Sequence, residues 1–273
     1  MGQSHERVKR VSAKKTKNRY LEFDGFSNLV SMFFQRAAEG GDKPFLNAKI
    51  DGEWRATSWA EAARQVAALA KSFQKIGLKP GERVMLVSDN CPQWCIADLA
   101  IIAARCITVP TYTTNTPSDH QHILDNSGAK AVIVSNQKLA QNLIPSVIKS
   151  SDADIVIGLT DLRIGQSGEF AIHQWNDLIQ GTDEDVTEIT AQVADIKRDE
   201  IACIIYTSGT GGKPRGVMQS HGAILHNVKG PAEVIENDFG WDEEVFLSFL
   251  PLSHAYEHSA GQFFPIGLGA EIY

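Results

Sequence analysis

YTSGTGGKPRGV, residues 206–217, follows the apolar run IACII at residues 201–205 and is the most distinctive stretch of the sequence. Glycine lets successive backbone N–H groups turn toward one point, which creates a concavity that binds anions. Three hydroxyls between the glycines can donate to phosphate oxygens or approach a magnesium ion: Thr207, Ser208 and Thr210. Two cations follow, Lys213 and Arg215, which would offset the charge of a polyphosphate. The stretch predicts a phosphate-binding loop directly after a strand.

Two common phosphate motifs do not fit these positions. The Walker pattern GxxxxGK[ST] cannot be written across them, and Pro214 occupies the last glycine position of the dinucleotide pattern G-x-G-x-x-G. Composition alone therefore leaves a second interpretation open, namely a hairpin loop without a ligand.

Apolar strands alternate with helices on both sides of this loop. Before it, the pattern predicts a helix from Ser27 or Asn28 to 38, a hairpin around Asp51-Gly52, and a helix from the capping box at Ser58 to 76. Further strands are expected at 83–87, 106–109, 130–134, 155–159 and 201–206, with helices at 92–105, 117–126 and 137–149. After the loop we expect strands at 215–219, 245–250 and 270–273, with helices at 220–236 and 255–268. Such alternation indicates a mostly parallel sheet covered on both faces.

Composition is that of an ordinary globular protein, with 43% hydrophobic residues and a formal net charge of −7 over 273 residues. The negative balance argues against a dedicated nucleic-acid binder, because phosphate contacts need clustered Lys and Arg. Residues 1–20 differ, since they carry seven basic side chains and a single acidic one. We interpret them as a flexible, solvated arm, with peripheral contact to anionic lipid as the alternative. The sequence has no signal peptide pattern and no run long enough to cross a bilayer, so a cytoplasmic location with reduced cysteines is expected.

The string at 206–217 resembles the phosphate-binding signature YTSGTTGxPKGV of the adenylate-forming, or AMP-binding, superfamily. Gly211 replaces the second Thr of that signature and Arg215 replaces its Lys. Six other stretches resemble the long-chain fatty acyl-CoA synthetase branch: GERV at 81–84, SDN at 88–90, VPTY at 109–112, NSGAK at 126–130, QSH at 219–221 and LPLSH at 250–254. Arg105 stands where many members have glycine.

This resemblance implies that ATP, magnesium, coenzyme A and a fatty acid are the ligands. It implies that the loop embraces the ATP phosphates, that Thr210 is a magnesium ligand and that Arg215 takes the place of the family's Lys. The implied nucleotide contacts are Tyr206, Thr207, Ser208, Gly209, Thr210, Gly211, Gly212, Lys213, Arg215 and Gly216.

HAYEH at residues 254–258 allows three interpretations. It matches the H-x-x-E-H pattern of inverted zinc peptidases, in which His254 and His258 would hold zinc and Glu257 would act as a base. It also fits a helix start with partly buried histidines. The resemblance instead implies that His254 orients the carboxylate substrate and that Tyr256 and His258 shape or gate the acyl pocket.

The expected fold is α/β, with layered, mostly parallel sheets flanked by helices, as in the N-terminal portion of the adenylate-forming fold, here truncated. We expect an arm at 1–20, a first lobe at 21–180 and a second lobe at 181–273. The expected activity is ATP-dependent conversion of a fatty acid to its adenylate and then to acyl-CoA, with Thr210, Arg215 and His254 as catalytic groups. The isolated chain is expected to be inactive or nearly so. A non-catalytic binding domain of the same fold and a zinc hydrolase are the two alternatives.

Overall fold

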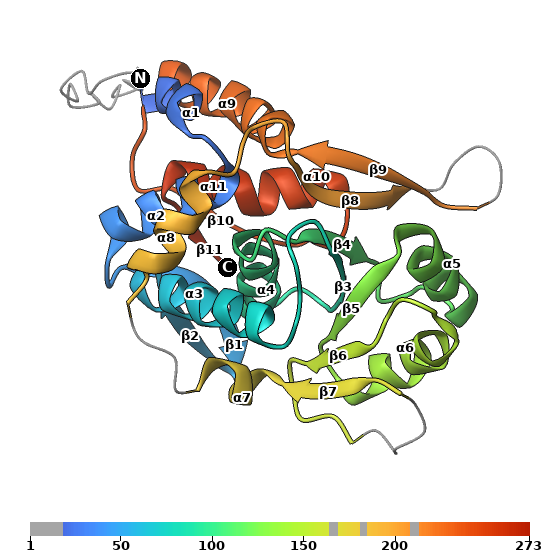
Figure 1. Cartoon of the computed structure of the whole chain (residues 1–273). Helices are drawn as coiled ribbons and strands as arrows, with labels where there is room; N and C mark the ends of the chain where they lie inside the picture. Colours follow the sequence, from blue (N-terminus) through green and yellow to red (C-terminus); the bar gives the residue numbers. More distant parts are fainter. Residues whose placement is uncertain (1–18, 164–168, 181–184, 208–212) are drawn as a thin grey trace, which may run out of the picture.

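The computed structural model describes residues 19–163, 169–180, 185–207 and 213–273. Two β-sheets with helices between and around them make up an α/β fold (Figure 1). A single hydrophobic core joins the two sheets, because Phe45 and Ile272 of one sheet and Val84 of the other belong to the same buried cluster. The expected class, mostly parallel layered sheets flanked by helices, is confirmed.

The larger sheet has seven strands in the order β7-β6-β5-β3-β4-β8-β9. Every neighbouring pair in it is parallel except β8 and β9, which form an antiparallel hairpin. Its strands are β3 (Arg83–Val87), β4 (Ile107–Thr111), β5 (Ala129–Val134), β6 (Ile155–Gly158), β7 (Ala171–Gln174), β8 (Ile201–Thr207) and β9 (Arg215–Ser220).

Helices cover both faces of this sheet, so its central strands are apolar at consecutive positions. Val84 and Leu86 point to one face, where they join the core of α3 (Trp59–Lys75) and α4 (Pro92–Ala103). Met85 and Val87 alternate with them and pack toward α5 (Pro117–Ser127) and α6 (Gln137–Lys149) on the other face (Figure 1).

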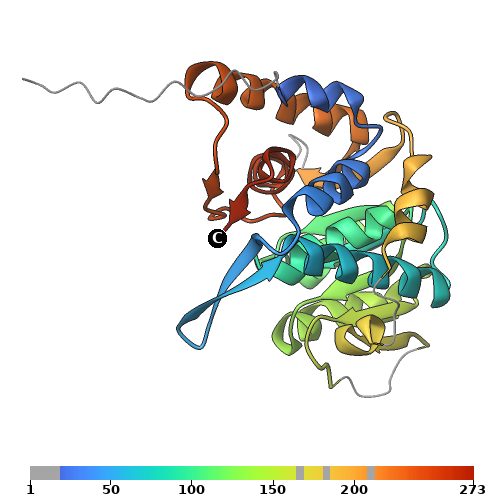
Figure 2. The same ribbon diagram turned by 90° about the vertical axis from the view of Figure 1, so that its left-hand side faces the viewer.

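The smaller sheet joins the two ends of the described chain. Its order is β10-β11-β1-β2, where β1 (Pro44–Ile50) and β2 (Glu53–Ser58) form the expected hairpin and β11 (Glu271–Ile272) pairs with β1. Positive φ angles at Asp51 (53°) and Gly52 (88°) confirm the turn between β1 and β2. Figure 2 shows this hairpin extending from the body beside the C-terminal end. Both sheets combine strands from either side of residue 180, so the sheets do not follow the expected division into lobes.

Most of the remaining elements follow the expected pattern. The N-terminal part contains η1 (Arg19–Leu21), α1 (Glu22–Gly25) and α2 (Leu29–Gly40), and α9 (His221–Asp238) follows β9. Two helix starts were correctly expected, since Asn28 accepts from Ser31 N at 2.8 Å and Ser58 accepts from Glu61 N at 3.1 Å. Arg105, at the position where the resemblance implies glycine in many members, has φ +62°, the left-handed region that favours glycine.

Three expectations need correction. Between 160 and 200, strand β7 and two short helices, α7 (Trp175–Ile179) and α8 (Thr187–Ala194), were not predicted. The expected strand at 245–250 is confined to β10 (Val245–Phe246). The expected helix at 255–268 is divided into α10 (Ala255–Glu257), a π-helix η2 (His258–Phe263) and α11 (Phe264–Leu268).

Most of the basic arm lies outside the described residues. Its last part is attached to the body, because the Arg19 guanidinium lies 4.5 Å from the Trp241 ring centroid and Arg19 N donates to Glu236 at 3.1 Å. Lipid contact by the arm stays a prediction. None of the helices in the described part of the chain has the length and apolar character that a bilayer crossing requires.

Two buried histidines predict how stability changes in acid. Burial lowers the pKa of both His120 and His221 to about 4, whereas the unperturbed value is 6.5. Both are therefore neutral in the fold, and the unfolded chain takes up more protons between pH 6.5 and 4. We expect the free energy of unfolding to fall as pH drops through that window, by about 2 kcal/mol for each histidine at pH 5. Urea denaturation at pH 7 and pH 5 measures this loss.

His221→Asn is the matched variant for that measurement. His221 Nδ1 accepts from Leu29 N at 3.2 Å, and an Asn side-chain oxygen can replace this acceptor without titrating. The variant should lose less stability than the parent between pH 7 and 5. An equal loss in both proteins would contradict the role assigned to His221.

Candidate active site

The phosphate-loop motif connects the two strands of an antiparallel hairpin. β8 ends at Thr207 and β9 begins at Arg215, and these two residues are register partners. The five motif positions between the strands that carry most of the glycines and hydroxyls lie outside the described residues: Ser208, Gly209, Thr210, Gly211 and Gly212. Both cations that follow, Lys213 and Arg215, are exposed. The motif therefore connects two strands of a hairpin. This geometry is compatible with a phosphate-binding loop and also with a hairpin loop that binds no ligand.

Side chains of α5 hold both ends of this connection. The Tyr206 hydroxyl donates to Asn126 Oδ1 at 2.7 Å, and His122 Nε2 lies 2.8 Å from the Pro214 carbonyl oxygen. Position 216 requires glycine because the Ile204 side chain packs closely against its backbone: a Cβ there would lie 2.8 Å from the Ile204 Cγ2 atom. The strand ends around the motif are therefore fixed by specific contacts.

A cavity of about 320 Å3 opens beside these strand ends. Thr207 and Pro214 line it, and His254 joins them from a distant part of the sequence. Thr111 also lines the cavity, and its buried Oγ1 atom has no hydrogen-bond partner in the described part of the chain. Thr111 and Thr207 end the neighbouring parallel strands β4 and β8, and ligands of α/β sheets bind outside such carboxyl ends.

A second cavity, of about 350 Å3, lies on the other side of α10. Tyr256 lines it together with Phe264 and Val228, and Ala255 borders both cavities. The turn at residues 254–256 therefore presents His254 to the first cavity and Tyr256 to the second. His254 also caps α10, since its Nδ1 accepts from Tyr256 N at 3.2 Å.

His258 lies in neither cavity. Its ring is completely buried, and Nε2 is 3.0 Å from Asp98 Oδ2. Burial alone would lower the pKa of His258, but the adjacent Asp98 carboxylate raises it to about 10. A role of His258 in shaping or gating the acyl pocket stays a prediction.

The zinc interpretation finds no support in the geometry. His254 caps a helix, His258 faces Asp98, and Glu257 accepts from the Ser248 hydroxyl at 3.0 Å. Within the described ranges, no group of three or more His, Cys, Asp or Glu side chains could hold a metal ion.

Comparison with known proteins identifies the fold and the family. The profile of the family described as AMP-binding enzyme matches residues 33–273. The chain belongs to the AMP-binding enzyme family. Among solved structures, the anthranilate CoA ligase AuaEII in complex with anthranoyl-AMP has a TM-score of 0.74 at 19% identity and covers 94% of this chain. A benzoate CoA ligase from Burkholderia xenovorans has a TM-score of 0.71 at 25% identity over 90% of this chain. The chain covers 46% and 45% of those two proteins.

Several curated relatives of this chain are named long-chain-fatty-acid–CoA ligases. FadD15 of Mycobacterium tuberculosis is 30% identical over 227 residues, which are 83% of this chain and 36% of FadD15. ACSBG2 of Xenopus laevis is 28% identical over 225 residues, which are 82% of this chain and 30% of that protein. The chain thus spans about a third of the length of these relatives.

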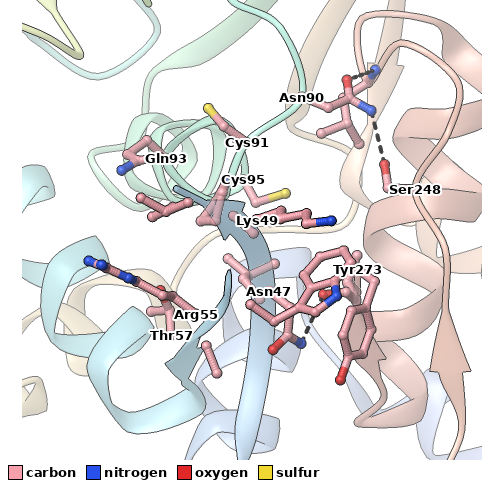
Figure 3. A pocket seen from close by; sticks show the side chains of 18 residues that line it. Asn47, Lys49, Arg55, Thr57, Asn90, Cys91, Gln93, Cys95, Ser248 and Tyr273 are labelled. Atoms are coloured by element: carbon pink, nitrogen blue, oxygen red, sulfur yellow. Dashed lines mark hydrogen bonds between the residues drawn. The ribbon is translucent and has the colours of Figure 1, made fainter. Parts of the chain in front are cut away.

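Contacts just before α4 hold the PLSH segment of this chain. Asn90 Nδ2 donates to the Leu250 carbonyl at 2.7 Å, and Leu252 N donates to Asn90 Oδ1 at 2.9 Å. These contacts border a third cavity of about 490 Å3 between the β1–β2 hairpin and α4 (Figure 3). Its two cations, Lys49 and Arg55, extend in opposite directions, so they do not form one anion site (Figure 3).

Sequence reasoning missed four of the residues that organise the site. Asn90 and Asn126 entered only as letters of family-like stretches, and His122 was given no role in a site. Asp98 had one signal, its position as the sole charged residue in the apolar run 94–104. A carboxylate in such a run needs a buried partner, but the sequence does not identify His258 as that partner.

Proposed function

We propose that this chain forms the ATP- and acid-binding part of a ligase that converts a long-chain fatty acid to its acyl-adenylate and then to acyl-CoA. The observation that carries the proposal is the cavity shared by Thr207 and His254 at the end of the hairpin that bears the family signature. Relatives named long-chain-fatty-acid–CoA ligases support the substrate class.

The residues around the first cavity suit a nucleotide triphosphate next to a carboxylate. The Thr207 hydroxyl can donate to a phosphate oxygen. Lys213 and Arg215, whose side chains are exposed directly after the loop, offset the negative charge. We assign the magnesium contact to Thr210, as the motif implies; the ion would neutralise phosphate charge.

In the first step, a carboxylate oxygen of the acid bonds to the α-phosphorus of ATP and the bond to pyrophosphate breaks. The protein holds the two anions together and stabilises the developing charge. His254 orients the carboxylate, and the mainly apolar cavity beside Tyr256 receives the acyl chain. In the second step, the coenzyme A sulfur bonds to the acyl carbon and AMP leaves. We assign the complete reaction to the full gene product, because the part of FadD15 that aligns with this chain is only 36% of that relative.

ATP–pyrophosphate exchange by the full gene product, with saturated fatty acids of graded length, tests this function. We expect exchange that depends on the acid and is strongest with long chains. His254→Ala should reduce exchange at least tenfold, because one misplaced reactant lowers the rate steeply.

His226→Ala is the matched control, since His226 is an exposed histidine on α9 and lines neither cavity. It should leave exchange unchanged. Exchange only with short or aromatic acids would refute the substrate class. ATP binding without exchange for any acid would favour the non-catalytic alternative.

A further inference from the structure

Asp98 is a buried carboxylate with a function that the reaction above does not explain. It lies on α4, where every residue from Trp94 to Ala103 is buried, and its own side chain is inaccessible. A fully buried carboxylate is costly unless it is paired and hydrogen-bonded. Its retention in this helix therefore calls for a specific role.

Both partners of Asp98 come from the π-helix η2. His258 Nε2 lies 3.0 Å from Asp98 Oδ2, and Gln262 Nε2 donates to the same oxygen at 2.7 Å. Because the two partners lie about one turn apart, the shared carboxylate fixes which face of η2 turns toward α4. π-Helical turns are rare and occur frequently at functional sites.

The segment before η2 carries the two side chains that line the cavities. Tyr256 lies on α10, which continues directly into η2, and His254 is the N-cap residue of α10, four positions before His258. Asn90 holds this segment on its N-terminal side through Leu250 and Leu252. The segment is therefore attached to the α4 region at both ends, before His254 and after Tyr256.

Because no substrate can reach these buried side chains, the same cluster has no catalytic role. Cys203 Sγ lies 3.8 Å from His258 Nδ1, so Cys203, His258 and Asp98 have the order of a nucleophile, a base and its orienting acid. All three side chains are 0% exposed, so no substrate reaches the sulfur. The cluster holds elements together rather than performing chemistry.

From this geometry we infer that Asp98 is a positioning residue. By binding His258 and Gln262, it sets the rotation of the helical segment 255–263 and thereby places His254 at the first cavity and Tyr256 at the second. The catalytic consequence rests on the proposed ligase function, whereas the placement of His254 does not.

Asp98→Asn in the full gene product tests the catalytic consequence, because it removes the charge and keeps the shape. We expect kcat for adenylation, expressed per folded molecule, to fall about 10- to 100-fold, as a displacement of about 1 Å can do. KM for ATP should change less than about threefold, since the hairpin contacts to α5 remain. Gln262→Met is a milder variant that removes one hydrogen bond. It should also lower kcat more than it changes KM for ATP, with a smaller loss of kcat than in Asp98→Asn.

Phe73→Leu is the control for stability alone, since Phe73 is fully buried on α3 and contributes to the core there. It should lower the unfolding midpoint without lowering kcat per folded molecule. If kcat per folded molecule is also unchanged in Asp98→Asn and Gln262→Met, Asp98 is only structural and the inference is wrong.

A second measurement on the chain itself is independent of ligase activity. In a 1H–13C NMR spectrum of the histidine rings, the Cε1–Hε1 signal of His254 should shift or broaden in both variants, while that of His122 stays in place. An unmoved His254 signal would overturn the inference. If the parent enzyme shows no exchange with any acid, the proposed function fails, and the NMR result alone decides the positioning role.

Discussion

Thr210→Val is expected to reduce ATP–pyrophosphate exchange by the full gene product about 100- to 1000-fold. The substitution keeps the size of the side chain and removes the hydroxyl that we assign to the magnesium and phosphate contact. Catalysis of this kind depends on preorganised donors around the developing charge, so one lost donor acts mainly on the rate. Exchange of labelled pyrophosphate into ATP at saturating acid measures the effect.

Thr210→Ser is the matched control, because it retains the hydroxyl on a smaller side chain. We expect exchange within about tenfold of the parent, and unfolding midpoints of both variants close to that of the parent. A Thr210→Val protein with near-normal exchange would contradict the assignment of this loop to the nucleotide phosphates.

Trp59→Ala is expected to cost about 3–5 kcal/mol of unfolding free energy, the largest stability effect that we predict. The Trp59 ring is 2% exposed and stacks on Phe45 with centroids 3.8 Å apart. Its removal leaves a cavity between α3, the smaller sheet and Gly40, where an added Cβ would lie 2.5 Å from the indole. Urea denaturation of the chain, followed by circular dichroism, measures the loss.

Trp54→Ala provides the comparison at an exposed tryptophan nearby in the sequence. Trp54, on β2, is 56% exposed, and its ring centroid lies 4.9 Å from that of Tyr273. We expect a loss below about 1 kcal/mol. Similar losses for the two variants would show that burial does not determine the contribution of these tryptophans.

Local signals in the sequence predicted much of the fold. Asn28 and Ser58 cap helices because their side-chain oxygens accept from backbone N–H groups three positions on, which is a short-range effect. Runs such as Arg83–Val87 become central strands because both faces are covered. The motif at 206–217 also indicated the family, and the family profile confirms it.

Long-range contacts were the part that sequence reasoning did not predict. The helix expected at 255–268 is interrupted by η2, where His258 and Gln262 both bind Asp98 from 160 or more positions earlier. The same contact holds the His258 ring in the core against α4. Strand β7 and the helix α8 were not predicted because their own sequences show little periodicity. Packing against distant elements determines their structure.

The smaller sheet has a consequence for the synthesis of the protein. Asn47 on β1 donates to the Ile272 carbonyl, a contact that spans 225 positions. At 5–20 residues per second, the ribosome adds Ile272 about 10–45 s after Asn47. During that interval the inner edge of β1 is available to chaperones or to other nascent chains, so slow translation would raise the risk of aggregation before the sheet closes.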